Sequence, residues 1–133
     1  MPFDVLLVED NAGDALLIRQ ILLECSPEAK LHIARDGEQA IQMLTEPHFT
    51  SELIILDLNI PRVSGLGVLE RVSRRDAPIV IFSSSWNERE INKALALGAQ
   101  EFVRKPMDIQ DFMSAVSHIL DKWTPSSRHC LPN

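Results

Sequence analysis

The stretch LIILDLNIP, Leu53–Pro61, carries a carboxylate directly after a run of apolar residues. An apolar run that does not alternate with polar residues is typical of a strand buried on both faces of a parallel sheet. Burial of a charge is costly, so we expect Asp57 to lie where the strand ends and the chain leaves the core. In open parallel sheets, ligands bind beyond the carboxyl ends of the strands. The stretch therefore indicates a parallel α/β fold with a binding site at Asp57.

Short apolar runs recur along the chain and predict five strands. Segments with helical spacing separate the runs, as at Ala15, Ile18 and Leu22. This alternation favours an α/β fold of the three-layer (βα)5 type, a doubly wound sandwich with a parallel five-stranded sheet at its centre. One domain over residues 1–123 accounts for the pattern, and residues 124–133 are expected to form a flexible C-terminal tail. The runs are Val5–Val8, Leu31–Ala34, Leu53–Leu56, Ile79–Phe82 and Phe102–Val103.

Composition and charge argue against several classes of protein. The 133 residues carry a formal net charge of −6, which is unsuited to a general nucleic-acid surface. Cys25 and Cys130 are too few for a disulfide framework. No apolar run approaches the roughly 20 residues of a membrane span. We therefore expect a cytoplasmic protein that contacts neither nucleic acid nor membrane directly.

Polar side chains stand at the carboxyl ends of four of the predicted strands. Glu9 and Asp10 follow the first strand, and Asp57 follows the third. Ser83 and Lys105 follow the fourth and the fifth. If the first and third strands are neighbours, their carboxylates lie close together and raise each other's pKa unless a cation offsets the repulsion. Oxygen ligands suit Mg²⁺, with Mn²⁺ as the alternative, and the added ammonium and hydroxyl fit a phosphoryl group.

Four motifs resemble successive signatures of one family, the receiver domain of bacterial two-component response regulators. The resemblance runs from about Phe3 to Trp123, and it implies a flavodoxin-like sheet with strand order 2-1-3-4-5. Because the motifs match in both order and spacing, the resemblance does not rest on a single short pattern. The motifs are LLVEDN (Leu6–Asn11), DLNIPRVSG (Asp57–Gly65), IVIFSSS (Ile79–Ser85) and EFVRKP (Glu101–Pro106).

The resemblance implies a chemistry for the acidic residues. Asp57 would be the phosphoacceptor, taking a phosphoryl group from the phosphohistidine of a sensor histidine kinase in a Mg²⁺-dependent reaction. Asp10 and Asp57 would hold the ion directly. Glu9 would act through water, the backbone carbonyl of Asn59 would complete the shell, and Lys105 would hold a phosphoryl oxygen. The implied protein is a signalling domain that catalyses only its own phosphorylation and slow dephosphorylation, and is not an enzyme in the usual sense.

The resemblance also implies a conformational response. Ser83 would donate a charge-assisted hydrogen bond to the new phosphoryl group, and Phe102 stands where the family carries a rotating aromatic switch. The switched surface would contact a downstream protein that the sequence does not name. A homodimer is an open alternative, because Trp86 is expected to be exposed. The resemblance is to the stand-alone, chemotaxis-regulator-like members of the family. Two narrower features are similar to stand-alone regulators of the kind that partner phytochrome-type kinases: VEDNAGDALLIRQIL (Val8–Leu22) and HILDKW (His118–Trp123).

Other interpretations of the same residues stay open. Asp10 or Asp14 fits a helix cap, which is the favoured role for Asp14. Ser83 also suits a turn, Lys105 a solvated charge, and Phe102 the core. Two further functions use the same residue types: a Mg²⁺-dependent aspartyl-phosphate phosphatase, as in haloacid-dehalogenase-like folds, and an interaction module that works without phosphorylation.

Overall fold

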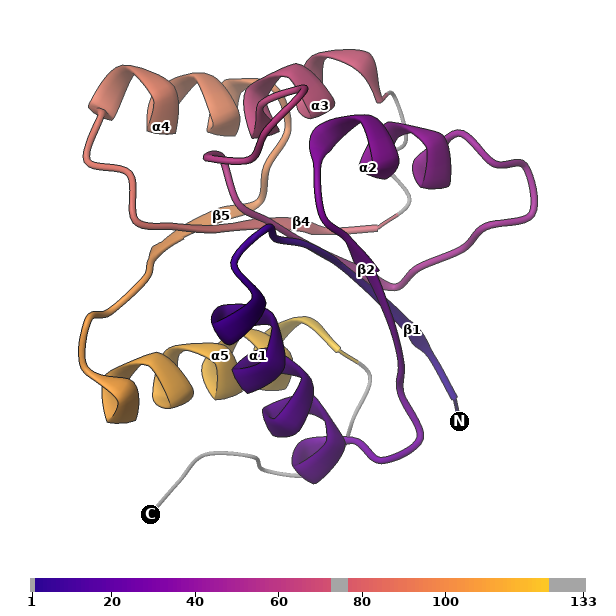
Figure 1. The fold of residues 1–133 in the computed structure, drawn as a ribbon, viewed down its shortest axis with the longest axis vertical. Helices are drawn as coiled ribbons and strands as arrows, with labels where there is room; N and C mark the ends of the chain where they lie inside the picture. The colour runs from indigo at the N-terminus through magenta and orange to yellow at the C-terminus, as the bar shows by residue number, and fades with distance from the viewer. Residues whose placement is uncertain (1, 73–76, 125–133) are drawn as a thin grey trace.

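The computed structural model describes residues 2–72 and 77–124, in which five strands alternate with five helices (Figure 1). Every strand predicted from an apolar run is present, and four of them extend one or two residues beyond the run. The strands are β1 (Asp4–Val8), β2 (Lys30–Ala34), β3 (Leu53–Leu56), β4 (Ile79–Ser83) and β5 (Glu101–Arg104). The helices are α1 (Ala12–Cys25), α2 (Gly37–Leu44), α3 (Gly65–Arg71), α4 (Glu88–Ala96) and α5 (Ile109–Trp123).

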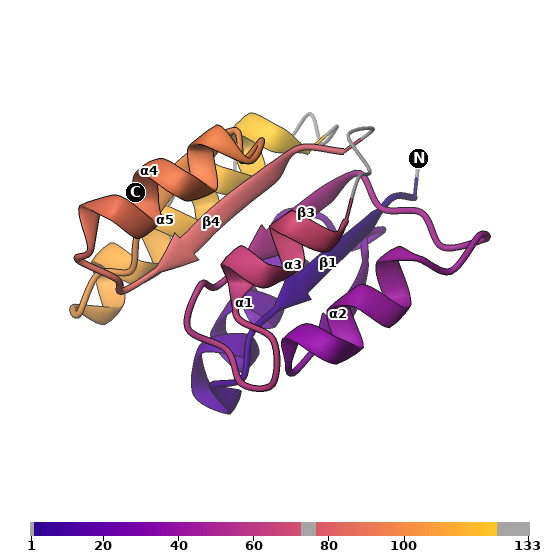
Figure 2. The ribbon, with the colours of Figure 1, turned by 90° about the horizontal axis from the view of Figure 1, so that it is seen from above.

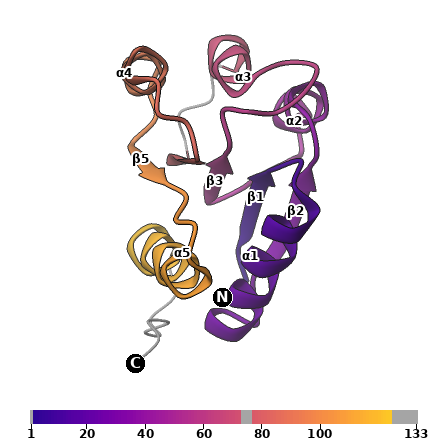
Figure 3. The same cartoon turned by 60° about the vertical axis from the view of Figure 1, so that its left-hand side comes forward.

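The strands form one parallel sheet in the order β2-β1-β3-β4-β5. Helices α1 and α5 cover one face of the sheet, and α2, α3 and α4 cover the other (Figures 1 and 3). Seen from above, the second group of helices lies side by side (Figure 2). This is the predicted three-layer, flavodoxin-like sandwich. Because the strand order reverses between β1 and β3, the carboxyl ends of these two strands border the crevice where such folds bind ligands.

Burial differs between the central and the edge strands. All residues of β3 and of β4 are buried. Strands β2 and β5 lie at the edges of the sheet, and most of their residues are only partly buried. The expectation that a non-alternating apolar run is buried on both faces is therefore wrong for β2 and β5, because an edge strand has a neighbouring strand on one side only.

Each helix begins at a side chain that accepts a hydrogen bond from the backbone of its first turn. Helix α1 begins after Asn11, whose Oδ1 accepts from the backbone N–H of Asp14 at 2.9 Å. The prediction that Asp14 caps this helix is wrong, and Asp10 does not cap it either, because Asn11 has the extended backbone of an N-cap and fills that role. The other N-caps are Asp36, Ser64, Asn87 and Asp108.

Most, but not all, of the apolar residues with helical spacing pack on the sheet. Ala15, Ile18 and Leu22 of α1 are buried, as the spacing predicts. Leu95 and Ile109 fit the same pattern but are 41% and 56% exposed. Ile109 is the first residue of α5. The side chain of Leu95 points about 100° around the axis of α4 from that of the buried Ala94. Spacing alone therefore overestimates the width of the buried helix face.

The C-terminal boundary is described as far as Thr124. Its backbone N–H donates to the carbonyl of Leu120 and ends α5. The rest of the predicted tail 124–133, including Cys130, lies outside the described residues. Within the described ranges, no helix is both long enough and apolar enough to cross a bilayer.

Candidate functional site

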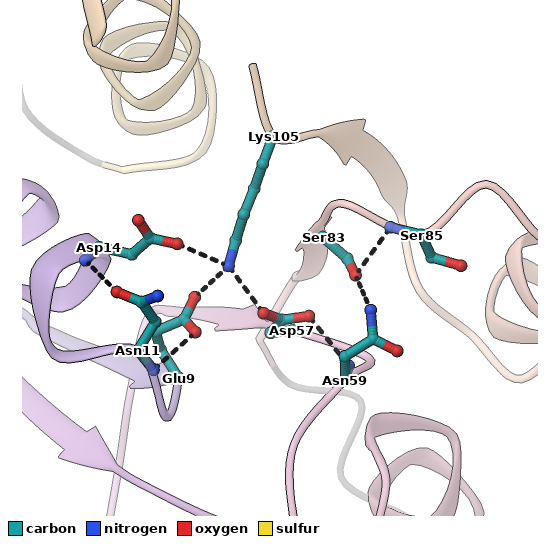
Figure 4. Close-up of polar contacts among 8 residues, drawn as sticks. All are labelled: Glu9, Asn11, Asp14, Asp57, Asn59, Ser83, Ser85 and Lys105. Carbon is teal, nitrogen blue, oxygen red and sulfur yellow. Dashed lines mark hydrogen bonds and ion pairs between the residues drawn. The ribbon is translucent and has the colours of Figure 1, made fainter. Parts of the chain in front are cut away.

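Two buried carboxylates lie at the carboxyl ends of the neighbouring strands β1 and β3 (Figure 4). The backbone N–H of Glu9 donates to the carbonyl of Ala34 at 2.9 Å. The backbone N–H of Asp57 donates to the carbonyl of Val8 at 3.1 Å. These bonds continue the hydrogen-bond pattern of the sheet one residue past each strand. The sheet therefore fixes the backbone positions of both acidic residues. Glu9 is 1% exposed and Asp57 is 5% exposed.

Lys105 brings a single ammonium group into the middle of these acids. Strand β5 delivers it, and its backbone N–H donates to the carbonyl of Ser83 at 3.0 Å. Its Nζ lies 2.6 Å from Glu9 Oε1, 2.7 Å from Asp57 Oδ2 and, on the side of α1, 2.9 Å from an oxygen of Asp14. The Lys105 side chain is 10% exposed. The alternative that Lys105 is a solvated surface charge is therefore wrong.

The charges in this network change one another's affinity for protons. Burial raises the pKa of Glu9 to about 7, although its hydrogen bond to Lys105 and one from the Asn11 backbone work in the opposite direction. Burial alone would lower the pKa of Lys105, but its bonds to Asp57 and Glu9 outweigh that effect and raise it. The lysine therefore stays charged, while the most deeply buried acid is close to neutralisation at neutral pH.

Asp10 completes a cluster that could hold a divalent cation. One carboxylate oxygen from each of Glu9, Asp10 and Asp57 lies within 4.8 Å of the other two. Asp10 is exposed, so the cluster has a buried side and a side open to solvent. Together with Lys105 these acids line an open cavity of about 490 Å³. The donor set consists of carboxylate oxygens, which is the chemistry of a hard divalent metal site.

Two further predicted residues, Asn59 and Ser83, border Asp57 on the side of β4 (Figure 4). The backbone N–H of Asn59 donates to Asp57 Oδ1 at 2.9 Å and so fixes the rotation of the carboxylate. Ser83 is fully buried, and its Oγ accepts from Asn59 Nδ2 at 3.5 Å and from the backbone N–H of Ser85 at 3.4 Å. Both bonds are long, and neither uses the hydroxyl proton of Ser83.

A protein-family model described as the response regulator receiver domain matches residues 5–117. The chain belongs to the response regulator receiver domain family. The two-component response regulator ARR17 of Arabidopsis thaliana is 34% identical over 131 residues, which cover 88% of this chain and 84% of ARR17. Response regulator Rcp1 of Synechocystis is 29% identical, with 92% of this chain and 89% of Rcp1 covered. Receiver domains are signalling domains that interact with histidine kinases.

Solved receiver domains have the same fold. The crystal structure of the Mn²⁺-bound form of Rcp1 matches with a TM-score of 0.85 and 28% identity, covering 99% of this chain and 100% of that one. The crystal structure of the phosphorylated cyanobacterial phytochrome response regulator RcpA matches with a TM-score of 0.86 and 27% identity, covering 92% and 94%. The fold and family implied by the sequence motifs are thereby confirmed.

Asp14 is the site residue of this receiver domain that the sequence did not reveal. It lies in the first turn of α1, and its Oδ2 accepts a hydrogen bond from Lys105 Nζ at 2.9 Å. The Asp14 backbone N–H donates to Asn11 Oδ1, which sets the start of the helix and so aims the Asp14 side chain at the sheet edge. In the sequence, Asp14 stands out only by lying one helical turn after the acidic pair. Many first-turn acids without a role in a site occupy such a position.

Phe102, the predicted aromatic switch, and Trp86, the predicted exposed contact, lie near the end of β5. Phe102 of the receiver domain is partly buried and packs against the core on the side of α2, α3 and α4. Trp86, in the loop between β4 and α4, is 76% exposed, and the guanidinium of Arg104 lies 3.5 Å from the centre of its ring. Phe102 thus belongs to β5 itself, and Trp86 lies against the last residue of that strand, Arg104.

Proposed function

We propose that this receiver domain accepts a phosphoryl group on Asp57 from the phosphohistidine of a sensor histidine kinase. The observation that carries the proposal is the 2.7 Å contact between Lys105 Nζ and Asp57 Oδ2 at the end of a central strand. A carboxylate is a poor nucleophile toward an anionic phosphoryl group, so positioning and charge neutralisation must supply most of the acceleration. A buried acid held against a fixed ammonium provides both.

The proposed transfer is a direct displacement at phosphorus. A carboxylate oxygen of Asp57 forms the new P–O bond as the P–N bond of the phosphohistidine breaks. The electron pair of the broken bond stays on the imidazole, which leaves as a neutral ring when its other nitrogen carries a proton. Lys105 donates to an oxygen of the transferred group and offsets its charge.

The acidic cluster fits a divalent cation, and we propose Mg²⁺ with Mn²⁺ as the alternative. Glu9, Asp10 and Asp57 offer oxygen ligands at mutual distances that one small ion can span. Asp10 and Asp57 are the proposed direct ligands, Glu9 acts through water, and the backbone carbonyl of Asn59 completes the set. When bound, the ion would supply positive charge beside the incoming phosphoryl group. The similar regulator Rcp1 has a Mn²⁺-bound form, which supports the binding of a divalent ion by this chain.

Ser83 is the residue proposed to change its hydrogen bonding first when Asp57 is phosphorylated. Its present contacts, at 3.4 and 3.5 Å, are weak, and its proton is not used in either of them. A charge-assisted bond to a phosphoryl oxygen is worth about 1.5–3 kcal/mol, which shifts a two-state population by roughly 10- to 100-fold. The loop that follows Ser83 would move with it, and Phe102 would turn inward in response.

The proposed output is a protein contact, not turnover of a substrate. A phytochrome-type kinase is the proposed donor, because RcpA, a phytochrome response regulator, has a similar structure. The receiver of the signal is a downstream protein or, as the alternative, a second copy of this chain, for which the exposed Trp86 offers an apolar contact. The proposed compartment is the cytoplasm, where ATP-dependent kinases form phosphohistidine.

Incubation with acetyl phosphate and Mg²⁺, followed by intact-mass and peptide mass spectrometry, tests the proposed function. The expected result is one phosphoryl group per chain, located on Asp57, and none in Asp57→Asn. A label on another residue would overturn the assignment of Asp57. Rapid multiple turnover of p-nitrophenyl phosphate would favour the phosphatase instead, and a chain inert to both reagents would favour the interaction module.

A further inference from the structure

The ammonium group of Lys105 has no hydrogen-bond donor to spare. An ammonium carries three N–H donors, and Lys105 Nζ lies within hydrogen-bond distance of three carboxylates, those of Glu9, Asp14 and Asp57. Any phosphoryl oxygen that Lys105 is to hold must therefore take the place of one of these acids. Which acid stays with the lysine decides where its remaining donors point.

The three acids are not equivalent. Asp57 is the proposed acceptor, and Glu9 and Asp57 both belong to the cluster whose oxygens could share a cation. Asp14 is outside that cluster and is 26% exposed at its side chain. It comes from a different element, the first turn of α1, and lies across Lys105 Nζ from Asp57 (Figure 4).

We infer that Asp14 is a positioning residue that holds Lys105 Nζ at the α1 side of the cavity and aims it at a phosphoryl group on Asp57. The inference rests on the proposed function, because it concerns the phosphorylated form of the same site. Asp14 is not a member of the acidic cluster and bonds Lys105 Nζ, so it acts through the lysine. The Asp14 backbone N–H donates to the N-cap Asn11 Oδ1 at 2.9 Å, so the protein itself fixes Asp14 without a metal ion.

The chain offers a matched control for the helix position. Asp111 lies in the first turn of α5, and its backbone N–H donates to the N-cap Asp108 at 3.0 Å, as that of Asp14 does to Asn11. Asp111 is exposed and does not line the cavity. Asp111→Asn therefore removes the same charge from an equivalent helix position without touching the network of Lys105.

The test measures the affinity of beryllofluoride, a phosphoryl analogue, by calorimetry in saturating Mg²⁺, and the affinity of Mg²⁺ alone. Asp14→Asn is expected to weaken beryllofluoride binding by about tenfold, the low end for a charge-assisted bond because Asp14 is partly exposed. Its effect on Mg²⁺ alone is expected to be below about threefold, because a charge outside the cluster acts on the ion only at a distance. Asp111→Asn should leave both affinities within about twofold.

A double-mutant cycle distinguishes positioning from a general loss of stability or charge. If Asp14 acts through the lysine, Asp14→Asn added to Lys105→Met causes no further loss of beryllofluoride affinity. An equal tenfold loss in that background, an unchanged affinity in Asp14→Asn, or a gain in affinity would each overturn the inference. A wild-type protein that binds no beryllofluoride in Mg²⁺ would instead refute the proposed function, and the role of Asp14 with it.

Discussion

The buried carboxyl of Glu9 should make the stability of the metal-free protein depend on pH. Its pKa is raised from 4.5 to about 7 in the folded protein, so between these values the folded protein binds a proton that the unfolded chain has lost. Stability from this group is fully present below pH 4.5 and is lost as the pH rises through 7. At about 1.36 kcal/mol per pKa unit, the shift corresponds to about 3 kcal/mol.

Urea unfolding in EDTA at a series of pH values between 4.5 and 8 measures this loss, with Glu9→Gln as the partner variant. Glutamine keeps the shape of the side chain and does not ionise, so the free energy of unfolding of wild type relative to Glu9→Gln should fall by about 3 kcal/mol across the range. The raised pKa of Lys105 does not interfere, because the stability it adds is lost only above its ordinary value of 10.5. Glu24→Gln, at an exposed position on α1, controls for removal of a carboxylate.

Parallel stability curves for wild type and Glu9→Gln would refute the reasoning. They would show that the pKa of Glu9 is the same in the folded and the unfolded chain. Lys105 would then fully offset the cost of burying the Glu9 carboxylate. A difference that grows with pH for Glu24→Gln as well would point to net charge as the cause, because that side chain has no part in the buried network.

Three further substitutions should change stability or the response to phosphorylation. Lys105→Met should lower the free energy of unfolding in EDTA at pH 8 by about 3–5 kcal/mol, because it leaves buried carboxylates without a neighbouring positive charge. Urea unfolding measures this loss, which should be smaller at pH 5. Gly37→Ala should lower the free energy of unfolding by at least about 2 kcal/mol in thermal unfolding, because the new Cβ would lie 1.8 Å from the backbone oxygen of Val63. Gly13→Ala is the control: a Cβ there would have its nearest neighbouring atom at 3.3 Å, and the free energy of unfolding should change by less than about 1 kcal/mol. Ser83→Ala should still be phosphorylated by acetyl phosphate but should lose the amide chemical-shift changes in the loop between β4 and α4, as measured by NMR.

The acidic cluster could be located from sequence because it depends on backbone topology. Each of its members stands one or two residues past a strand, and parallel strands bring their carboxyl ends to one edge. Only the adjacency of β1 and β3 had to come from the family resemblance, since apolar runs do not encode strand order. The position of Lys105 followed in the same way from the end of β5.

What could not be predicted depends on side-chain direction. The contact of Asp14 with Lys105 requires a helix start that turns one first-turn acid inward, and the N-cap Asn11, which sets that start, was not singled out in the sequence. A first-turn acid has a good alternative role near the helix N-terminus, so the pattern favoured a cap. The partial exposure of β2 and β5 was missed for a related reason, because an apolar run reports composition and not the number of neighbours a strand has.

Lys105 explains how several acids can stay together before any cation arrives. Alone, the carboxylates of Glu9 and Asp57 would repel each other in a buried setting, but both lie within 2.7 Å of the same ammonium. One positive charge does not balance these two acids together with Asp10 and Asp14, so the assembled site still attracts a divalent ion. A ligand that binds this folded arrangement and not the unfolded chain adds RT ln(1 + [L]/Kd) to its stability. Folding, cation binding and phosphoryl binding are therefore expected to be thermodynamically coupled through this network. Substitution of any of its acids should change the free energies of all three.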